Sequence, residues 1–390
     1  MEHRKEPHVW VRMLRAARLP ACVCVLLWVG VVACAPSLPA AYVQSKAEAH
    51  RAYSAGRYEE AATLFREAAS KADRGKERDE VLFLEAVAYE RVGRFREAQA
   101  LLDALLALSP DGRRAAHAAH GSARLEISHG EERKGWAMVH AAILRYPSSG
   151  LSRTAFVRYL VHLDEEYGAE RAITYLDRGA SWFDAHTLGE VAMYERAVRL
   201  EKLGRLQDAH DGFVACAQAY PYPKGALFDD ALYRSSLIDE ALGRGREAVE
   251  HLKEMMRFRE TSRTFGSYER PKFPAAQMRI AVLYRDVLGD PDSARREFRR
   301  LFDSFKTSIL RDDALWFEAL VARQQGDQRG ACDAVALLVK ALPDSRYVPC
   351  AKVVCEDVEV PARSKECRAY IMRDLGLPEP SSSEEGSTAG

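Results

Sequence analysis

A glycine recurs along most of the chain with a period close to 37 residues, and small and apolar residues stand at fixed distances after it. A small residue follows the glycine by five positions, and an apolar residue follows it by nine. Self-similarity with a period of about 20–50 residues is typical of solenoids, whose core grows repeat by repeat. The glycines are Gly56, Gly93, Gly130, Gly204, Gly243, Gly289 and Gly326, and the fourth turn falls on Tyr167, beside Gly168. The small residues are Ala61, Ala98, Gly135, Ala172, Ala209, Ala248, Ala294 and Ala331, and the apolar ones are Phe65, Leu102, Val139, Leu176, Phe213, Leu252, Phe298 and Val335.

The residue type at each offset predicts two helices joined by a turn. Glycine suits the left-handed turn that ends the first helix. The small residue lets the second helix pack closely against the first, and the apolar residue one turn later fills the core between them. Abundant Ala, Leu, Arg and Glu favour helix over strand. Proline ends the second helix in several units, because it cannot continue a helix. The closing prolines are Pro110, Pro147, Pro221 and Pro343.

This pattern resembles the tetratricopeptide repeat over residues 42–345, in about eight units. The resemblance implies an all-α fold, a right-handed alpha-alpha superhelix, in which the first helix of each unit lines a concave groove. Three units depart from the pattern: Gly135 replaces Ala in the third, the fourth glycine is shifted, and Pro291 follows the seventh turn.

Two further segments are predicted after and within the solenoid. Residues 346–376 are expected to form a C-terminal helical cap, and residues 377–390 are too polar to fold and form a disordered tail. The longer spacing between Gly243 and Gly289 indicates an insertion over residues 258–273. It is either a longer connector or a loop that contacts a partner, since solenoid insertions often lie on the binding face.

The N-terminus has the pattern of an export signal. Residues 1–18 are polar and Arg-rich, and residues 19–33 form an apolar run that is short for a membrane span. The run ends in Val-Val-Ala before Cys34, which resembles the lipobox of bacterial lipoproteins. This resemblance implies cleavage of a signal peptide at residues 1–33, acylation of Cys34 and a short linker over residues 34–41. The alternative is an uncleaved signal anchor. Ala35 follows the cysteine, and by resemblance to the sorting of enterobacterial lipoproteins this residue implies delivery to the outer membrane.

Composition and motifs argue against catalysis. The net charge is +0, without a basic tail or stripe, so we expect no nucleic-acid partner. His117 and His120 lack the glutamate of a His-Glu-x-x-His motif, and neither a phosphate-binding loop nor a Gly-x-Ser-x-Gly motif occurs. We therefore expect no enzyme activity, no cofactor and no metal site.

The cysteines favour an oxidising compartment. Four of them gather near the C-terminus and suggest two disulfides; the rival interpretation, metal binding, lacks the close cysteine pair of a zinc knuckle. Cys216 takes a core position and is predicted to be a buried thiol. The disulfide candidates are Cys332, Cys350, Cys355 and Cys367.

The first helices carry candidate partner-binding residues. An aromatic residue stands about ten positions before several of the turn glycines, and an acidic residue stands near the turn, on the same helix face. They form either a groove for a partner segment with apolar and basic side chains, or ordinary packing with solvated acids. The aromatic residues are Phe83, Tyr194, Tyr233 and Phe317, and the acidic residues are Glu90, Asp164, Glu201, Glu240 and Asp286.

The resemblance to the lipoproteins of bacterial envelopes with tetratricopeptide repeats, such as the one in the outer-membrane β-barrel assembly machinery, gives the functional expectation. We expect a lipid-anchored scaffold of the outer membrane that faces the periplasm and docks protein partners in an assembly, secretion or motility complex. The alternative is an accessory repeat subunit of an envelope enzyme or ligand-binding system.

Overall fold

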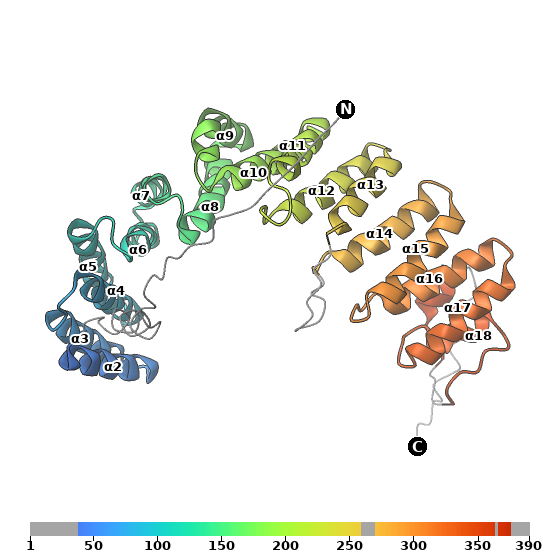
Figure 1. Cartoon of the computed structure of the whole chain (residues 1–390), viewed down its shortest axis with the longest axis horizontal. Coiled ribbons are helices and arrows are strands. Elements are labelled where there is room, and N and C mark those ends of the chain that lie inside the picture. Colours follow the sequence, from blue (N-terminus) through green and yellow to red (C-terminus); the bar gives the residue numbers. More distant parts are fainter. Residues whose placement is uncertain (1–37, 259–269, 363–365, 376–390) are drawn as a thin grey trace, which may run out of the picture. The chain divides into compact units, whose positions relative to one another are not determined.

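The computed structural model describes residues 38–258, 270–362 and 366–375, and within these ranges the regular structure is helical, with no strand (Figure 1). Cys34, the signal segment at residues 1–33 and the tail at residues 377–390 lie outside the described residues. No helix among those described has the length and apolar character needed to cross a membrane.

The chain divides into two compact units, which we describe separately. The N-terminal unit reaches Val139 and the C-terminal unit begins at His140. Within the N-terminal unit, consecutive helices up to Ser128 pack against each other. Its helices are α2 (Ala40–Ser54), α3 (Tyr58–Ser70), α4 (Gly75–Arg91), α5 (Phe95–Leu108) and α6 (Ala115–Ser128), and α7 (Glu132–Arg145) begins in it.

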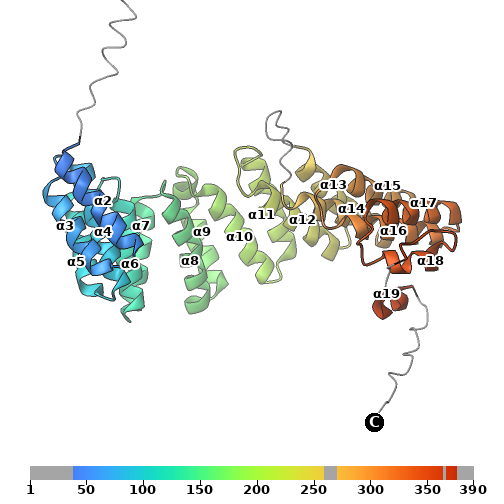
Figure 2. The same ribbon diagram turned by 90° about the horizontal axis from the view of Figure 1, so that it is seen from below.

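The C-terminal unit repeats the same arrangement of antiparallel helix pairs, seen from two sides in Figures 1 and 2. Its paired helices are α8 (Gly150–Tyr167), α9 (Ala169–Asp184), α10 (Gly189–Lys202), α11 (Leu206–Ala219), α12 (Phe228–Ala241), α13 (Gly245–Met256), α14 (Phe273–Asp286), α15 (Pro291–Ser304), α16 (Arg311–Gln324) and α17 (Gln328–Ala341). We number the helix pairs as repeats 1 to 8, from α2/α3 to α16/α17, and call the members of each pair its first and second helix.

The predicted turn glycines carry the backbone conformation that the turn requires. Each has a positive φ, between 61° and 90°. Gly168, at φ 83°, takes this role in repeat 4, so the shifted glycine of the sequence pattern is itself the turn residue. An L-residue in this region is strained, which explains why the period of the chain is marked by glycine.

The small and apolar offsets form the core, as predicted. The alanines five residues after the turn are fully buried, and the apolar residues nine after it are also buried. The departure at Gly135 has a steric reason, because a Cβ there would lie 2.4 Å from Cγ1 of Ile127. Pro291 begins α15 at a position where its missing N–H costs nothing, and the Asp290 side chain caps the helix by accepting from Ser293 N at 2.9 Å.

Most of the insertion at residues 258–273 lies outside the described residues, and the choice between connector and partner loop stays a prediction. Its described ends are anchored by Arg270. This guanidinium donates to the Met255 and Phe258 carbonyl oxygens at 3.0 and 2.7 Å, and lies 4.2 Å from the centre of the Tyr222 ring. Its charge is balanced by Asp229 on α12, at 3.0 Å.

The end of the solenoid is covered by short elements: η1 (Val348–Cys350), α18 (Ala351–Val354) and α19 (Ala369–Asp374). Helices this short are marginal on their own. Two disulfides tie them to repeat 8 and to each other: Cys332 of α17 pairs with Cys355, and Cys350 pairs with Cys367. These four cysteines are the disulfide candidates of the sequence, and the structure supplies their connectivity.

Candidate partner-binding face of the first helices

The structure places the nine candidate residues on first helices of both units. Within each unit, we call these residues and the basic side chains that contact them the first-helix face. In the N-terminal unit, α4 carries Phe83 and Glu90. In the C-terminal unit, the residues are Asp164 on α8, Tyr194 and Glu201 on α10, Tyr233 and Glu240 on α12, Asp286 on α14 and Phe317 on α16.

In the N-terminal unit, the acid is paired with an arginine of the next repeat. Both terminal nitrogens of Arg124 on α6 donate to the carboxylate of Glu90, each at 2.6 Å. Phe83 lies edge-on to the His117 ring, 5.5 Å between centres, and the Arg114 guanidinium lies 4.9 Å from the Phe83 ring centre. The α4–α6 contact therefore combines an aromatic residue with a bidentate ion pair.

The C-terminal unit repeats this pairing at two solvent-accessible positions. Arg234 on α12 donates to Glu201 on α10 at 2.5 Å, with 37% and 29% of the two side chains exposed. Arg279 on α14 donates in the same way to Glu240 on α12. We call these two pairs and Glu90–Arg124 the exposed rungs. Ion pairs of this kind gain little net free energy, so their partners can be exchanged at low cost.

The pair formed by Asp164 is different because it is buried. Arg199 on α10 has 2% of its side chain exposed and donates from Nε to Asp164 at 2.9 Å. Its second acceptor is Glu195, one helical turn earlier, at 2.7 Å. A buried guanidinium is costly to leave unpaired, so this pair holds repeats 4 and 5 together and is not available to a partner.

The aromatic residues of the C-terminal unit are half-buried. Tyr194 meets the Phe213 ring edge-on at 5.3 Å, and burial raises the pKa of its hydroxyl to about 12. Arg234 lies above the same two rings, 5.9 Å from that of Tyr194 and 5.7 Å from that of Phe213. Tyr233 has the Lys272 ammonium 5.5 Å from its ring centre. These rings pack against the core of the C-terminal unit and remain partly exposed.

In repeat 8 the position ten residues before the turn glycine holds Trp316, so the prediction of Phe317 for that position is wrong by one residue. Trp316, ten residues before Gly326, is buried and stacks on Tyr347 at 4.8 Å between ring centres. Phe317, one position later, packs on Phe298 of α15 at 5.7 Å and lies under Arg285, whose guanidinium is 5.2 Å from the ring centre. Asp286 is exposed and pairs with its neighbour Arg285 rather than with the next repeat.

The acids of the first-helix face do not stand alone. Each exposed rung presents an acceptor and a donor side by side, so that negative and positive charge alternate along the first helices of each unit. The arginines were missed in the sequence, although a signal exists: Arg124, Arg234 and Arg279 follow their acids by 34, 33 and 39 residues, which is close to one repeat. Such a surface can bind a polypeptide segment through ion pairs and aromatic contacts.

Comparisons with known proteins identify the repeat in two segments of the chain. Residues 52–122 and residues 275–308 each match a family model described as tetratricopeptide repeat. No curated protein matches the chain.

Solved structures that are similar to parts of this chain include the following three. One is a tetratricopeptide repeat protein from Parabacteroides merdae ATCC 43184, with 12% identity over 71% of this chain and 97% of that chain and a TM-score of 0.33. Another is the C-terminal part of a repeat protein from Cytophaga hutchinsonii, with 11% identity over 79% and 98% and a TM-score of 0.38. PilW, a widely conserved type IV pilus biogenesis factor, has 16% identity over 61% and 98% and a TM-score of 0.36.

Proposed function

Since the chain is a tetratricopeptide-repeat protein, we propose that it is a scaffold that binds other proteins, and that a partner segment lies against the first-helix face. The observation that carries this proposal is the set of exposed rungs beside half-buried aromatic residues. In the C-terminal unit, Arg234 both pairs with Glu201 and covers Tyr194. A partner carboxylate can take the arginine, a partner amine can take the glutamate, and an apolar side chain can then pack on the ring.

The alternating charge sets the chemistry of the segment. A purely acidic face would select basic segments, whereas paired acids and arginines favour a segment that carries both signs together with apolar side chains. Aromatic anchors contribute most of the binding free energy at such interfaces, and charges at the rim mainly set the association rate and its salt dependence.

We place this scaffold in the bacterial envelope, held in the outer membrane by acyl chains on Cys34 and facing the periplasm. The export signal at residues 1–33 and the lipobox pattern support this location. The two disulfides near the C-terminus also support it, since disulfides persist in oxidising compartments. Two or three acyl chains suffice for stable anchoring, because each buried CH₂ contributes about 0.8 kcal/mol.

The binding proposal is tested by exchanging the charges of one exposed rung. Glu240→Arg alone brings two guanidinium groups together, and it should weaken both the packing of α12 on α14 and partner binding. Adding Arg279→Glu restores the internal ion pair in reversed order. We expect the double variant to have the melting temperature of the wild type. We expect it not to capture the partner in affinity purification from detergent-solubilised envelopes.

The matched control exchanges an ion pair outside the first-helix face. Arg196 of α10 donates to Asp177 on α9 at 2.6 Å, and both side chains are exposed. The double variant Asp177→Arg with Arg196→Asp should keep the partner. Full recovery of the partner by the exchanged Glu240–Arg279 variant, or equal loss in both double variants, would contradict binding at this face.

The location is tested through Cys34. Labelled palmitate should enter the wild-type protein, and Cys34→Ala should remain an unlabelled and uncleaved precursor. Absence of label from the wild type would overturn the lipid anchor and leave the binding proposal untouched.

A further inference from the structure

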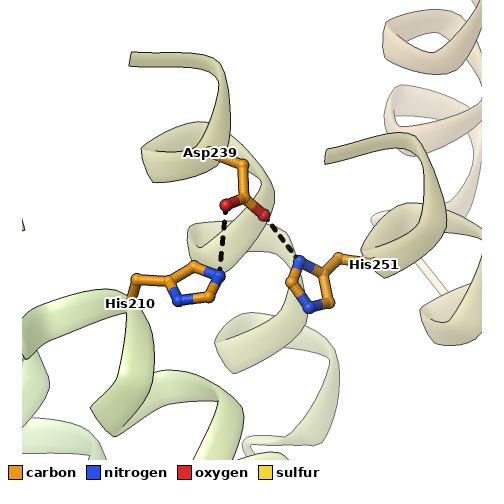
Figure 3. A group of neighbouring side chains, drawn as sticks. All are labelled: His210, Asp239 and His251. Carbon is orange, nitrogen blue, oxygen red and sulfur yellow. Dashed lines mark hydrogen bonds and ion pairs between the residues drawn. The ribbon is translucent and has the colours of Figure 1, made fainter. Parts of the chain in front are cut away.

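Three residues from three consecutive helices of the C-terminal unit converge on one point (Figure 3). His210 lies on α11, Asp239 on α12 and His251 on α13. Because α11 belongs to repeat 5 and the other two helices form repeat 6, the cluster links these two repeats. One nitrogen of each imidazole and a carboxylate oxygen all lie within 4.8 Å of one another. Asp239 is fully buried, while the two histidines are partly exposed.

The separations are close to those between ligands of one metal ion. His210 Nε2 lies 3.2 Å from Asp239 Oδ1, and His251 Nδ1 lies 2.8 Å from Asp239 Oδ2. Bonds of about 2.0 Å in tetrahedral geometry put two ligand atoms roughly 3.3 Å apart. Small rotations of the two partly exposed rings would therefore bring all three donors around a single ion.

The hydrogen bonding of His210 points to a cation between the ring and the carboxylate. Its Nδ1 lies 3.0 Å from the Asp211 carboxylate, which only accepts, so the proton belongs on Nδ1. In the neutral ring, Nε2 then directs a lone pair at Asp239 Oδ1, which is also an acceptor. Both Nε2 and Oδ1 are buried and make no hydrogen bond of good geometry, although the Arg244 guanidinium forms an ion pair with Oδ1 at 2.9 Å. A buried ring nitrogen is rarely left without a hydrogen bond, and an ion shared with Asp239 would satisfy it.

We propose that His210, Asp239 and His251 bind a divalent transition-metal ion of the zinc class. Two imidazoles and one carboxylate are the donor set that zinc accepts, and water would complete the coordination. Asp211 would orient His210 from outside the coordination sphere, in the manner of carboxylates behind metal-bound histidines. The ion would fasten repeat 5 to repeat 6 and thereby stiffen the part of the solenoid that carries Tyr194 and Tyr233.

One competing cation faces the cluster. The Arg244 guanidinium lies 2.9 Å from Asp239 Oδ1 and also donates to Gln207 at 2.9 Å. Its side chain is partly exposed, so it can leave Asp239 and keep Gln207 when an ion enters. Its charge lowers the affinity for the ion, and Arg244→Gln should raise that affinity by about tenfold, since it removes a positive charge next to the ligands.

The test is calorimetric titration of the full chain, without an affinity tag, with Zn²⁺. We expect one ion per chain, an affinity that falls as the pH is lowered and the histidines are protonated, and a higher melting temperature with Zn²⁺. His251→Gln should weaken binding by about tenfold or more and reduce the rise in melting temperature, because it removes a ligand. His117→Gln removes an imidazole from the N-terminal unit and should change neither.

Because Asp239 is buried, the Asp239→Asn variant can fail to fold. The test therefore uses substitutions of the more exposed His251, and circular dichroism verifies that the helices are intact. Co²⁺ provides a second readout, since a four-coordinate site gives visible absorption that His251→Gln should remove. Absence of Zn²⁺ binding, or binding that His251→Gln and His210→Gln leave unchanged, would overturn the proposal. Neither result bears on partner binding at the first-helix face.

Discussion

Arg234 of α12 donates to Glu201 of α10 at 2.5 Å and at the same time covers the ring of Tyr194, so one side chain connects two repeats, an acid and an aromatic residue. The equivalent acid one repeat earlier, Asp164, meets its arginine in a buried setting, with 9% of its side chain exposed. The same sequence position is thus solvent-accessible in one repeat and buried in another, and the difference in its contribution to stability can be measured.

Asp164→Asn and Glu201→Gln should differ in their cost to the free energy of unfolding. Asp164→Asn leaves the buried Arg199 with only Glu195 and should destabilise the chain by about 3 kcal/mol, the lower end of the range for broken buried pairs. Glu201→Gln breaks a pair that water screens and should cost less than about 1 kcal/mol. Urea unfolding of both variants gives the comparison, and equal costs would show that Arg199 does not depend on Asp164.

The turn glycines can be tested with a matched pair of alanine substitutions. Gly204 has φ +74°, and a Cβ at this position would meet no other atom within 4 Å, so Gly204→Ala should destabilise by about 1–2 kcal/mol through backbone strain alone. Gly150 begins α8 with equally open space and without a positive φ, so Gly150→Ala should be neutral or stabilise by up to about 1 kcal/mol. Thermal unfolding of the two variants decides, and a neutral Gly204→Ala would refute the turn argument.

The repeat architecture was predictable because it depends on contacts within one helix pair. Turn glycine, small residue and apolar residue lie within nine positions of each other, so their roles follow from local spacing, and even the shifted Gly168 keeps its positive φ. The exposed rungs were not predicted because they depend on how one repeat sits on the next. The cluster of His210, Asp239 and His251 has no local pattern at all, since its members come from three helices.

Cys216 should be inert in the folded chain. Its side chain is buried, its thiol lies 3.6 Å from the Glu190 carbonyl oxygen, and burial raises its pKa to about 12. The reactive thiolate is therefore nearly absent at pH 8. Iodoacetamide should leave the Cys216 peptide unmodified in native protein and alkylate it in denaturant, as read by mass spectrometry.

The same experiment tests the disulfides. Without reductant, the peptides of Cys332, Cys350, Cys355 and Cys367 should resist alkylation even in denaturant, and they should react after reduction. Alkylation of these four in unreduced, denatured protein from the envelope would contradict both bridges.

His140 should make stability fall in mild acid. Its ring stacks on Tyr159 at 5.0 Å, its Nε2 lies 3.1 Å from the Tyr175 hydroxyl, and burial lowers its pKa below the ordinary 6.5. At pH values between the pKa of His140 in the folded chain and 6.5, the unfolded chain binds more protons than the folded chain. The contribution of neutral His140 to the free energy of unfolding is therefore fully present above pH 6.5 and is lost as the pH falls below it. The free energy of unfolding of His140→Gln should decline less steeply than that of the wild type between pH 7.5 and 5.5. An equal decline of the free energy of unfolding in both proteins would contradict the lowered pKa of His140.

The most direct test of the central claim is photo-crosslinking in the cells from which the chain comes. A photoreactive phenylalanine at Lys202, which is 63% exposed beside Asp164 on the first-helix face, should give covalent adducts with a partner protein. The same group at Gln218, exposed on the second helix α11, should give none. Adducts at Gln218 and not at Lys202, or the same adducts at both positions, would contradict a partner-binding face on the first helices.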